Sequence, residues 1–250
     1  VLKMKKYQYL LFDLDGTLTD SKLGITTCVQ YALEKMGRKI PPIEELLCFI
    51  GPPLIVSFQE YCNMSLEEAK QATVFYRERY AVKGLFENKV YSGIPEVLEK
   101  LKQAGYVLAI ATSKPEEYLI RILDHFHLRD YFTTISGSGL LGERNSKTEV
   151  IKDALCQLAV WKEEKGKEIE QKRKESYYYR EKKAEETIWQ EVKQTAIMIG
   201  DRHHDIEGAK NCGIDSLGVH YGYAEPEELK AAGAVYEVDT VEDVGKFFVD

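Results

Sequence analysis

Short apolar runs that stop at polar turns recur along this chain, and this recurrence constrains the fold more than any other feature. Such a run predicts a buried strand, and the turn after it places polar side chains at the strand's carboxyl end. The clear runs are Tyr7–Leu14, Val107–Ala111, Ala196–Gly200 and Ser216–Val219, and Tyr131–Ser136 is a weaker candidate. The first three end at the turns Asp13–Thr17, Thr112–Pro115 and Asp201.

Helical patterns separate these runs, at Ile94–Ala104, Glu116–Phe126 and Ile206–Cys212. Gly105 and Gly213 are expected to end two of the helices, and Pro115 suits the first turn of another. Strands that alternate with helices predict an α/β fold, a Rossmann-like three-layer sandwich with a parallel central sheet. Ligands of such sheets bind beyond the carboxyl ends of the strands, so positions 13, 112 and 201 are expected to meet there.

Residues 21–88 have little strand pattern and many helix formers, which predicts a helical lobe inserted after the first strand. Pro41-Pro42 and Gly51–Pro53 are expected to divide this lobe into helices. Tyr80–Tyr91 is the expected return linker. The predicted sheet domain is therefore made of residues 1–20 and 89–250.

The segment Trp161–Lys193 fits this scheme poorly because it holds ten basic and nine acidic residues. Pairs such as Glu163/Lys167 have helical spacing with the acid first, the favourable order. We expect a long exposed helix or helical hairpin, broken at Gly166. The run Tyr177–Tyr179 marks an interaction face or covers the aliphatic stems of its charged neighbours.

Composition excludes some classes of function. The 250 residues are 44% hydrophobic, enough for a packed core, and the formal net charge is -7. This charge gives no basic field for nucleic acid and would repel an anionic membrane surface. No stretch approaches the roughly 18 apolar residues of a membrane span. The five cysteines are scattered without a metal-binding spacing, so we expect reduced thiols in a cytoplasmic protein.

Asp13 and Asp15 are two residues apart at the end of the first predicted strand, so they can address opposite sides of a bound group. That arrangement suits one nucleophile and one proton shuttle. Phosphoryl transfer depends mainly on positioning and charge neutralisation, so a carboxylate beside a cation can serve as the nucleophile. Gly16 and the hydroxyl of Thr17 leave room for a phosphate beside backbone N–H groups.

These residues resemble the motifs of the haloacid dehalogenase superfamily. Asp13–Asp20 resembles the first motif, Thr112-Ser-Lys114 the second, Lys147 the third and Gly200–Asp205 the fourth, in the family's order. The resemblance covers nearly the whole chain except the charged segment. It implies that the inserted helical lobe is a cap domain, which closes over the site.

The resemblance also implies a role for each matching residue. Asp13 would attack phosphorus and form an aspartyl-phosphate, while Asp15 would protonate the leaving oxygen and then activate water. Thr112 and Lys147 would stabilise the phosphoryl group. The implied phosphate-binding residues are Gly16, Thr17, Thr112, Ser113 and Lys147. Mg²⁺ would be held by Asp13, the backbone carbonyl of Asp15, Asp201 and waters, with Asp205 assisting directly or through water.

Asp15 favours phosphate ester cleavage, because dehalogenases and phosphonate-cleaving relatives lack an acid at that place. The stretch Phe49–Leu54 resembles a cap loop of phosphoglycolate-phosphatase-like members, which implies a small phosphorylated metabolite as substrate. His203 and His204 are expected to face the cap or support the site rather than bind metal.

Three alternatives remain open. A 5′-nucleotidase shares the same catalytic residues, because cap shape decides which leaving group fits. A sugar phosphomutase also retains an acid at the position of Asp15. The charged segment could instead make the chain a scaffold or assembly protein. The sequence leaves the oligomeric state open.

Overall fold

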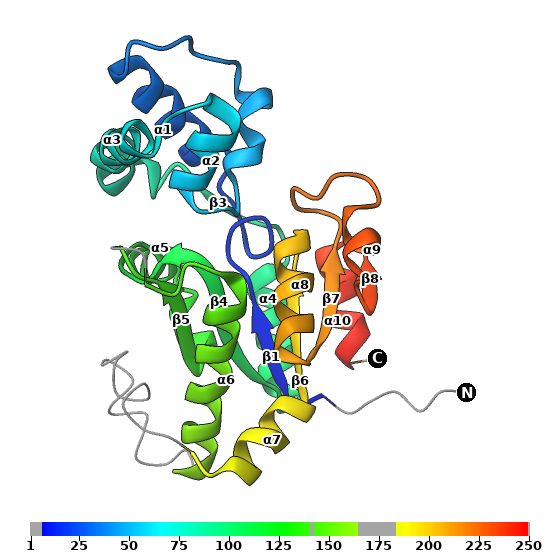
Figure 1. The fold of residues 1–250 in the computed structure, drawn as a ribbon. Coiled ribbons are helices and arrows are strands. Elements are labelled where there is room, and N and C mark those ends of the chain that lie inside the picture. The colour runs from blue at the N-terminus through cyan, green and yellow to red at the C-terminus, as the bar shows by residue number, and fades with distance from the viewer. Residues whose placement is uncertain (1–6, 141–142, 165–183, 250) are drawn as a thin grey trace.

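The apolar runs form one parallel sheet. The computed structural model describes residues 7–140, 143–164 and 184–249. Within these ranges six strands lie in the order β5-β4-β1-β6-β7-β8, and all neighbouring strands are parallel. The strands are β1 (Tyr9–Phe12), β4 (Val107–Pro115), β5 (Thr134–Ser138), β6 (Ala196–Gly200), β7 (Asp215–Val219) and β8 (Tyr236–Val238). β1 therefore lies between β4 and β6, in the middle of the sheet (Figure 1).

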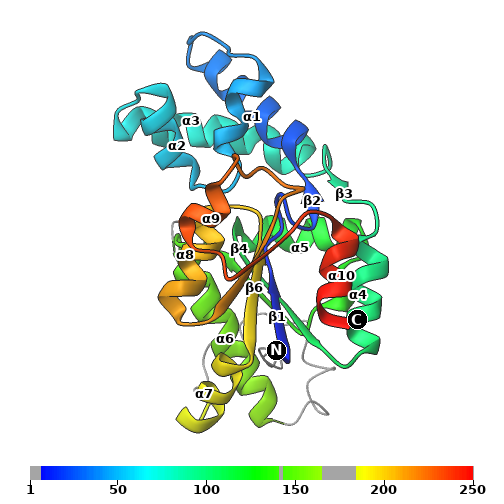
Figure 2. The ribbon, with the colours of Figure 1, turned by 90° about the vertical axis from the view of Figure 1, so that its right-hand side faces the viewer.

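Helices cover both faces of this sheet (Figure 2). One face packs against α4 (Ile94–Gln103), α5 (Glu116–His125) and α10 (Val241–Val249), and the other against α6 (Lys147–Glu163), α7 (Glu186–Gln194) and α8 (His203–Cys212). Successive residues of a strand point to opposite faces, so Leu10 and Phe12 join the first core and Tyr9 and Leu11 the second. The predicted three-layer α/β fold is confirmed.

Some boundaries differ from the sequence prediction. β4 continues to Pro115, with a shift of its register against β5 after Ala111. β5 begins at Thr134 because residues Arg129–Tyr131 form a short 3-10 turn. α8 begins at His203, three residues earlier than expected, and includes part of the fourth motif. The sequence analysis did not predict β8, α10 or the short α9 (Glu228–Ala232).

The glycines expected to end helices do so. Gly105 has φ +88° directly after the end of α4, and Gly213 has φ +69° at the end of α8. These left-handed conformations are favourable for glycine because it has no Cβ.

A separate helical lobe is inserted after β1 (Figure 1). The chain enters and leaves it through an antiparallel ribbon of β2 (Thr19–Asp20) and β3 (Lys89–Val90). Pro42 and Pro53 directly precede two of its helices, as expected. The helices of the lobe are α1 (Lys22–Lys35), the 3-10 helix η1 (Ile43–Phe49), α2 (Leu54–Cys62), α3 (Leu66–Arg79) and the π-helical turn η2 (Tyr80–Gly84).

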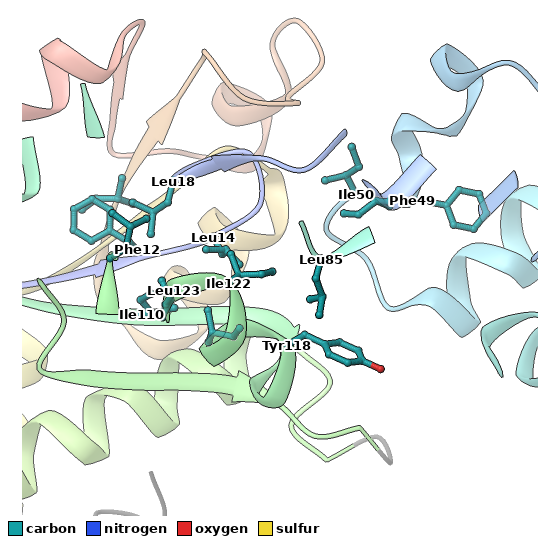
Figure 3. Packing of buried hydrophobic residues seen from close by; sticks show 14 of the residues in the cluster. Phe12, Leu14, Leu18, Phe49, Ile50, Leu85, Ile110, Tyr118, Ile122 and Leu123 are labelled. Atoms are coloured by element: carbon teal, nitrogen blue, oxygen red, sulfur yellow. The ribbon is translucent and has the colours of Figure 1, made fainter. Parts of the chain in front are cut away.

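The lobe and the sheet domain share one hydrophobic cluster. Leu14 and Ile122 belong to the sheet domain, and Ile50 and Leu85 belong to the inserted segment, yet all four are buried in the same cluster (Figure 3). The two parts of the chain are thus joined by packed apolar side chains as well as by the β2–β3 ribbon.

The charged segment does not form the predicted exposed element at its described ends. Trp161 of α6 and Trp189 of α7 are partly buried and pack against the core on the α6 face, and Val192 of α7 is fully buried. Lys162 of α6 also forms an ion pair with Glu191 of α7. The prediction of an exposed helix is wrong for these ends because their apolar residues complete the outer helical layer.

The middle of the charged segment, residues 165–183, lies outside the described residues. The predicted break at Gly166 and the run Tyr177–Tyr179 fall within it.

No helix in the described ranges is long and apolar enough to span a membrane. The five cysteines all fall within these ranges and are free thiols.

Candidate active site

Polar residues from three distant parts of the chain meet at one edge of the sheet. Asp13 follows β1, Thr112 lies near the end of β4, and Asp201 follows β6. All three side chains are buried. The three strands are parallel neighbours, so their carboxyl ends lie together. Later strands were added on both sides of β1, which makes its carboxyl end the switch point where ligands of such sheets bind.

Lys147 reaches this edge from the first turn of α6. Ser146 caps the helix by accepting a hydrogen bond from the Glu149 N–H, and Glu149 bonds back to the Ser146 N–H. The Lys147 Nζ lies 2.7 Å from Asp13 Oδ1 and 2.8 Å from Asp205 Oδ1. Burial alone would lower the pKa of Lys147, but these two carboxylates outweigh it and raise the pKa. Lys147 is therefore a buried, charged neighbour of Asp13.

Asp13, Asp201 and Asp205 form a buried acidic cluster in which one carboxylate oxygen of each residue lies within 4.8 Å of the other two. Burial, followed by the charges of Asp205 and Asp13, raises the pKa of Asp201 well above its ordinary value. Burial also raises the pKa of Asp205 to about 6, although Lys147 opposes this. A hard divalent cation would relieve the repulsion, and an all-carboxylate cluster is the kind of donor set that Mg²⁺ prefers. The residues present therefore fit a magnesium ion.

Glycines without side chains let the backbone approach Asp201. Gly16 has φ +85°, and a Cβ there would lie 2.0 Å from Asp201 Oδ2. A Cβ on Gly222 would lie 2.4 Å from the same carboxylate oxygen. Thr17 Oγ1 donates to Asp201 Oδ1 at 3.2 Å, and the Tyr223 N–H donates to Oδ2 at 2.8 Å. Asp201 is thus held in one orientation.

The N–H groups of Gly16 and Thr17, two of the residues predicted to bind phosphate, form hydrogen bonds within the turn after β1. The Gly16 N–H donates to the Thr19 carbonyl at 2.8 Å, and the Thr17 N–H donates to the Leu14 carbonyl at 3.3 Å. The Thr17 hydroxyl is directed to Asp201. The tight turn uses these donors itself, so Gly16 and Thr17 shape the acidic cluster.

Thr112 and Ser113 lie on the other side of Asp13, in β4. The Thr112 hydroxyl accepts a hydrogen bond from the Lys114 N–H at 3.3 Å. The Ser113 carbonyl accepts one from the Ser138 hydroxyl at 2.7 Å. The first bond lies within β4 and the second ties β4 to β5, so both predicted phosphate ligands are held in place.

Asp15 forms an ion pair with Lys114, the last residue of the second motif. No role was predicted for this lysine from the sequence. The Lys114 Nζ lies 2.7 Å from Asp15 Oδ2 and donates to the Tyr80 hydroxyl at 2.7 Å. Asp15 Oδ1 is buried and has no hydrogen-bond partner among the described residues. The position of Lys114 in the second motif was the available signal, but the pairing with Tyr80 depends on the packing of the inserted lobe.

Arg202 connects the fourth motif to the inserted lobe. Its Nη1 donates to the Ile50 carbonyl at 2.9 Å, and its Nε donates to Glu228 Oε1 at 2.9 Å. The ring Nδ1 of His203 also lies 2.7 Å from Glu228 Oε1. His203 is therefore directed to α9.

A cleft of about 390 Å³ opens between the lobe and the sheet domain beside Lys147. Gly51, Pro52 and Pro53 line it from the lobe. Its opposite wall contains Ser113, Lys147 and His204, together with Asn145, Glu149, Glu207 and Asn211. Lys147 is the one lysine or arginine among the lining residues that belong to the described ranges, and it is already paired with two carboxylates.

A parallel sheet with this cluster of carboxylates and lysines at its carboxyl edge, and with a helical lobe inserted after β1, is the architecture of a known class of hydrolases. The family model described as "Haloacid dehalogenase-like hydrolase" matches residues 10–165, and a second model of HAD-hydrolase-like proteins matches residues 176–245. The chain belongs to the haloacid dehalogenase-like hydrolase family and is a phosphoric monoester hydrolase.

Similar proteins carry several names. A 5′-nucleotidase of Pseudomonas aeruginosa is 38% identical over 90% of this chain and 88% of its own length. The tyrosine-protein kinase PtkA of Mycobacterium tuberculosis is 34% identical over 88% of this chain and 64% of its own length. A phosphoglycolate phosphatase of Vibrio parahaemolyticus is 25% identical over 94% of this chain and 93% of its own. The crystal structure of a predicted phosphatase from Clostridium acetobutylicum has 40% identity and a TM-score of 0.81, over 98% of this chain and 99% of that one.

Proposed function

We propose that this chain is a magnesium-dependent phosphatase that hydrolyses a small phosphate monoester through an aspartyl-phosphate on Asp13. The observation that carries the proposal is the convergence of Asp13, Lys147 and the carboxylates Asp201 and Asp205 on one buried point. A carboxylate in contact with a fixed ammonium group and a cation-binding cluster is suited to attack phosphorus.

Each residue of the site has a defined task. A carboxylate oxygen of Asp13 forms the new bond to phosphorus, while Asp15 gives its proton to the ester oxygen as the bond from phosphorus to that oxygen breaks. The alcohol then leaves, and Asp15 takes a proton from the water that hydrolyses the aspartyl-phosphate. Lys147 stabilises the phosphoryl charge, and Thr112 and Ser113 are proposed to bind its oxygens.

Asp13, Asp201, Asp205 and the backbone carbonyl of Asp15 would hold Mg²⁺. When bound, this ion supplies neutralisation of negative charge on the phosphoryl group. Four carboxylates and two ammonium groups at the site leave two negative charges uncompensated when all are ionised, which matches one divalent cation.

The inserted lobe is proposed to be a cap made of residues 21–88. Its loop at Gly51–Pro53 forms one wall of the cleft, and its Ile50 carbonyl contacts Arg202 of the sheet domain. Such a cap excludes water and leaves little space for a macromolecule, which favours a small metabolite as substrate. A cytoplasmic location is consistent with free thiols.

Asp13→Asn tests the mechanism. With Mg²⁺ and p-nitrophenyl phosphate, we expect the wild-type chain to release phosphate and the variant to lose at least about 1000-fold in kcat, because an amide is a far poorer nucleophile. Wild-type protein quenched in acid during turnover should gain the mass of one phosphoryl group, and Asp13→Asn should not. Asp239→Asn, at an exposed position, is the matched control. Undiminished release by Asp13→Asn would refute the mechanism.

A 5′-nucleotidase is the second candidate, supported by the relative of that name and by the chemistry of the cleft. Apart from Lys147 the polar lining is neutral or acidic, with amides at Asn145 and Asn211 and carboxylates at Glu149 and Glu207. Hydroxyls of a ribose suit such a lining, whereas a second carboxylate or phosphate would meet like charges.

A substrate panel separates the candidates. For a 5′-nucleotidase we expect kcat/KM for a nucleoside 5′-monophosphate to exceed that for phosphoglycolate and pyrophosphate by at least about 10-fold. Glu207→Gln should reduce this difference in kcat/KM, because it removes one negative charge that repels phosphoglycolate and pyrophosphate. A gap in the opposite direction favours a phosphoglycolate phosphatase. Isomerisation of a sugar 1-phosphate without net phosphate release would support a phosphomutase instead.

The scaffold alternative depends on the charged segment, most of which lies outside the described residues. It remains an untested alternative.

A further inference from the structure

A buried ammonium group links the general acid of the proposed reaction to the inserted lobe. The Lys114 Nζ lies 2.7 Å from both Asp15 Oδ2 and the Tyr80 hydroxyl, and 4.9 Å from the centre of the Tyr80 ring. Lys114 is 8% exposed and Tyr80 is 2% exposed. A charge buried in this way needs close partners, and here it has one on each side of the boundary between the two lobes.

Tyr80 reaches this position because the chain forms a π-helical turn, Tyr80–Gly84, where the lobe returns to the sheet domain. The turn packs tightly, since a Cβ on Gly84 would lie 2.6 Å from Cys28 Sγ and 2.7 Å from Tyr80 Cδ2. Arg121 of α5 donates to the Ala81 carbonyl at 2.9 Å. Local π-turns of this kind often lie at functional sites, and this one aims a phenol of the lobe into the site.

Other aromatic rings hold Tyr80 in place. Tyr76 stacks on it with ring centres 5.1 Å apart, and Tyr118 of α5 meets it edge-on at 5.4 Å. Burial raises the pKa of the Tyr80 hydroxyl to about 12 despite the opposing charge of Lys114, so Tyr80 is a neutral phenol that accepts a hydrogen bond from the ammonium group.

The two oxygens of Asp15 are therefore not equivalent. Oδ2 accepts from Lys114, whereas Oδ1 is buried without a hydrogen-bond partner among the described residues. Lys114 therefore engages Oδ2 and leaves Oδ1 as the oxygen available for proton transfer. This is the arrangement needed to deliver a proton in one fixed direction.

We propose that Tyr80 of the inserted lobe is a positioning residue for Asp15, acting through Lys114. The inference rests on the proposed phosphatase mechanism and adds that the packing of the lobe sets the orientation of the group that protonates the leaving oxygen. The lobe thereby completes the acid step as well as covering the substrate.

Tyr80→Phe tests this inference, because it keeps the ring and removes only the hydroxyl. The sensitive measurement is kcat/KM for an alkyl phosphate, whose leaving oxygen needs a proton, against kcat/KM for p-nitrophenyl phosphate, whose leaving group departs without one. Loss of one hydrogen bond to a charged group predicts about a 10-fold fall for the alkyl phosphate. We expect less than about a 3-fold fall for the aryl phosphate, with little change in its KM.

Tyr118→Phe is the matched control, since it also removes a tyrosine hydroxyl beside Tyr80, whereas the hydrogen bond of Lys114 Nζ goes to the Tyr80 hydroxyl. It should leave the ratio of the two kcat/KM values unchanged. Equal losses of Tyr80→Phe on both substrates would mean a general structural role, and no loss on either would mean no role, so both overturn the inference. Turnover of the aryl phosphate by the wild-type chain, and its loss in Asp13→Asn, test the phosphatase mechanism separately.

Discussion

Gly16 is the residue whose side chain, or lack of one, most directly shapes the acidic cluster. It combines a left-handed backbone with close approach to Asp201, and only glycine meets both requirements without strain. A sequence reading identifies Gly16 as a turn residue, but the clash that any Cβ would cause is visible only when Asp201, far along the chain, is in place.

Gly16→Ala should cost clearly more stability than Gly105→Ala. The two glycines have nearly the same φ, +85° and +88°, but a Cβ on Gly105 meets nothing within 4 Å. Both variants incur about 1 kcal/mol of left-handed strain. Gly16→Ala should lose about 1–3 kcal/mol more, because Asp201 must move. Urea unfolding of both variants checks this, and equal losses would contradict the proposed collision.

Lys114 illustrates the limit of reading residues singly. Its position in the second motif was evident in the sequence, and so was that of Asp15, yet their ion pair was not predicted. A lysine can extend in many directions from a strand end, and only the neighbouring carboxylate and phenol select one.

At the scale of elements, α8 and α9 are joined through one carboxylate. Glu228, the first residue of α9, accepts hydrogen bonds from the His203 N–H at 2.8 Å and from Arg202 Nε at 2.9 Å, and its other oxygen accepts from the Glu225 N–H at 2.9 Å. Arg202 in turn contacts the Ile50 carbonyl of the inserted lobe. Glu228 thus anchors the residue that connects the two lobes.

Glu228→Gln should lower the free energy of unfolding at neutral pH. It should also make that free energy fall less steeply as the pH is lowered. Burial alone would raise the pKa of Glu228, but its hydrogen bonds outweigh this and lower the pKa from 4.5 to about 2. A lowered folded-state pKa contributes stability that is present above the unfolded value and is lost as pH falls from 4.5 toward 2. We expect the variant to be about 1–3 kcal/mol less stable at pH 7.

Urea unfolding of the wild-type chain and the variant between pH 7 and pH 3 measures this difference. The difference in free energy of unfolding between the wild-type chain and the variant should shrink below pH 4.5. The exposed Glu34→Gln serves as control and should show a small, constant gap. A gap for Glu228→Gln that does not change with pH would contradict the assignment.

At the scale of the whole molecule, the fold gathers carboxylates at the cost of stability. Asp13, Asp201 and Asp205 come from the ends of two strands and the first turn of α8, and burial together with their mutual repulsion raises the pKa of Asp201. The packing of the surrounding layers sustains this arrangement. Function and stability therefore oppose each other at the acidic cluster.

Mg²⁺ should stabilise the whole chain through this cluster. At a concentration about 100 times its Kd, a ligand of the folded state adds about 2.7 kcal/mol, which corresponds to a rise in Tm of roughly 5–10 °C for a chain of this size. Asp201→Asn should abolish most of the rise in Tm with Mg²⁺, because it removes one carboxylate from the cluster that would hold the ion. Thermal melts in EDTA, in MgCl₂ and in NaCl of equal ionic strength check this. An equal Mg²⁺ shift in both proteins would show that the ion binds elsewhere.

The sequence by itself determined a parallel sheet between two helical layers, without the strand β8, and the identity of the carboxylates at its edge. These follow from local patterns: apolar runs of strand length, glycines at helix ends and polar turns directly after strands such as β1 and β6. The parallel arrangement then brings Asp13 and Asp201 together without further information, because neighbouring parallel strands share one carboxyl edge.

Only the tertiary structure decided how these groups are held. The sequence did not predict the link from Asp15 through Lys114 to Tyr80. It also did not predict that the Gly16 and Thr17 N–H groups bond within their own turn, or that Val192 is buried in the outer layer. Each depends on contacts between residues far apart in sequence, or on competition among nearby acceptors. Such contacts exist only once two lobes and three layers have packed, and no local pattern encodes which side chains then meet.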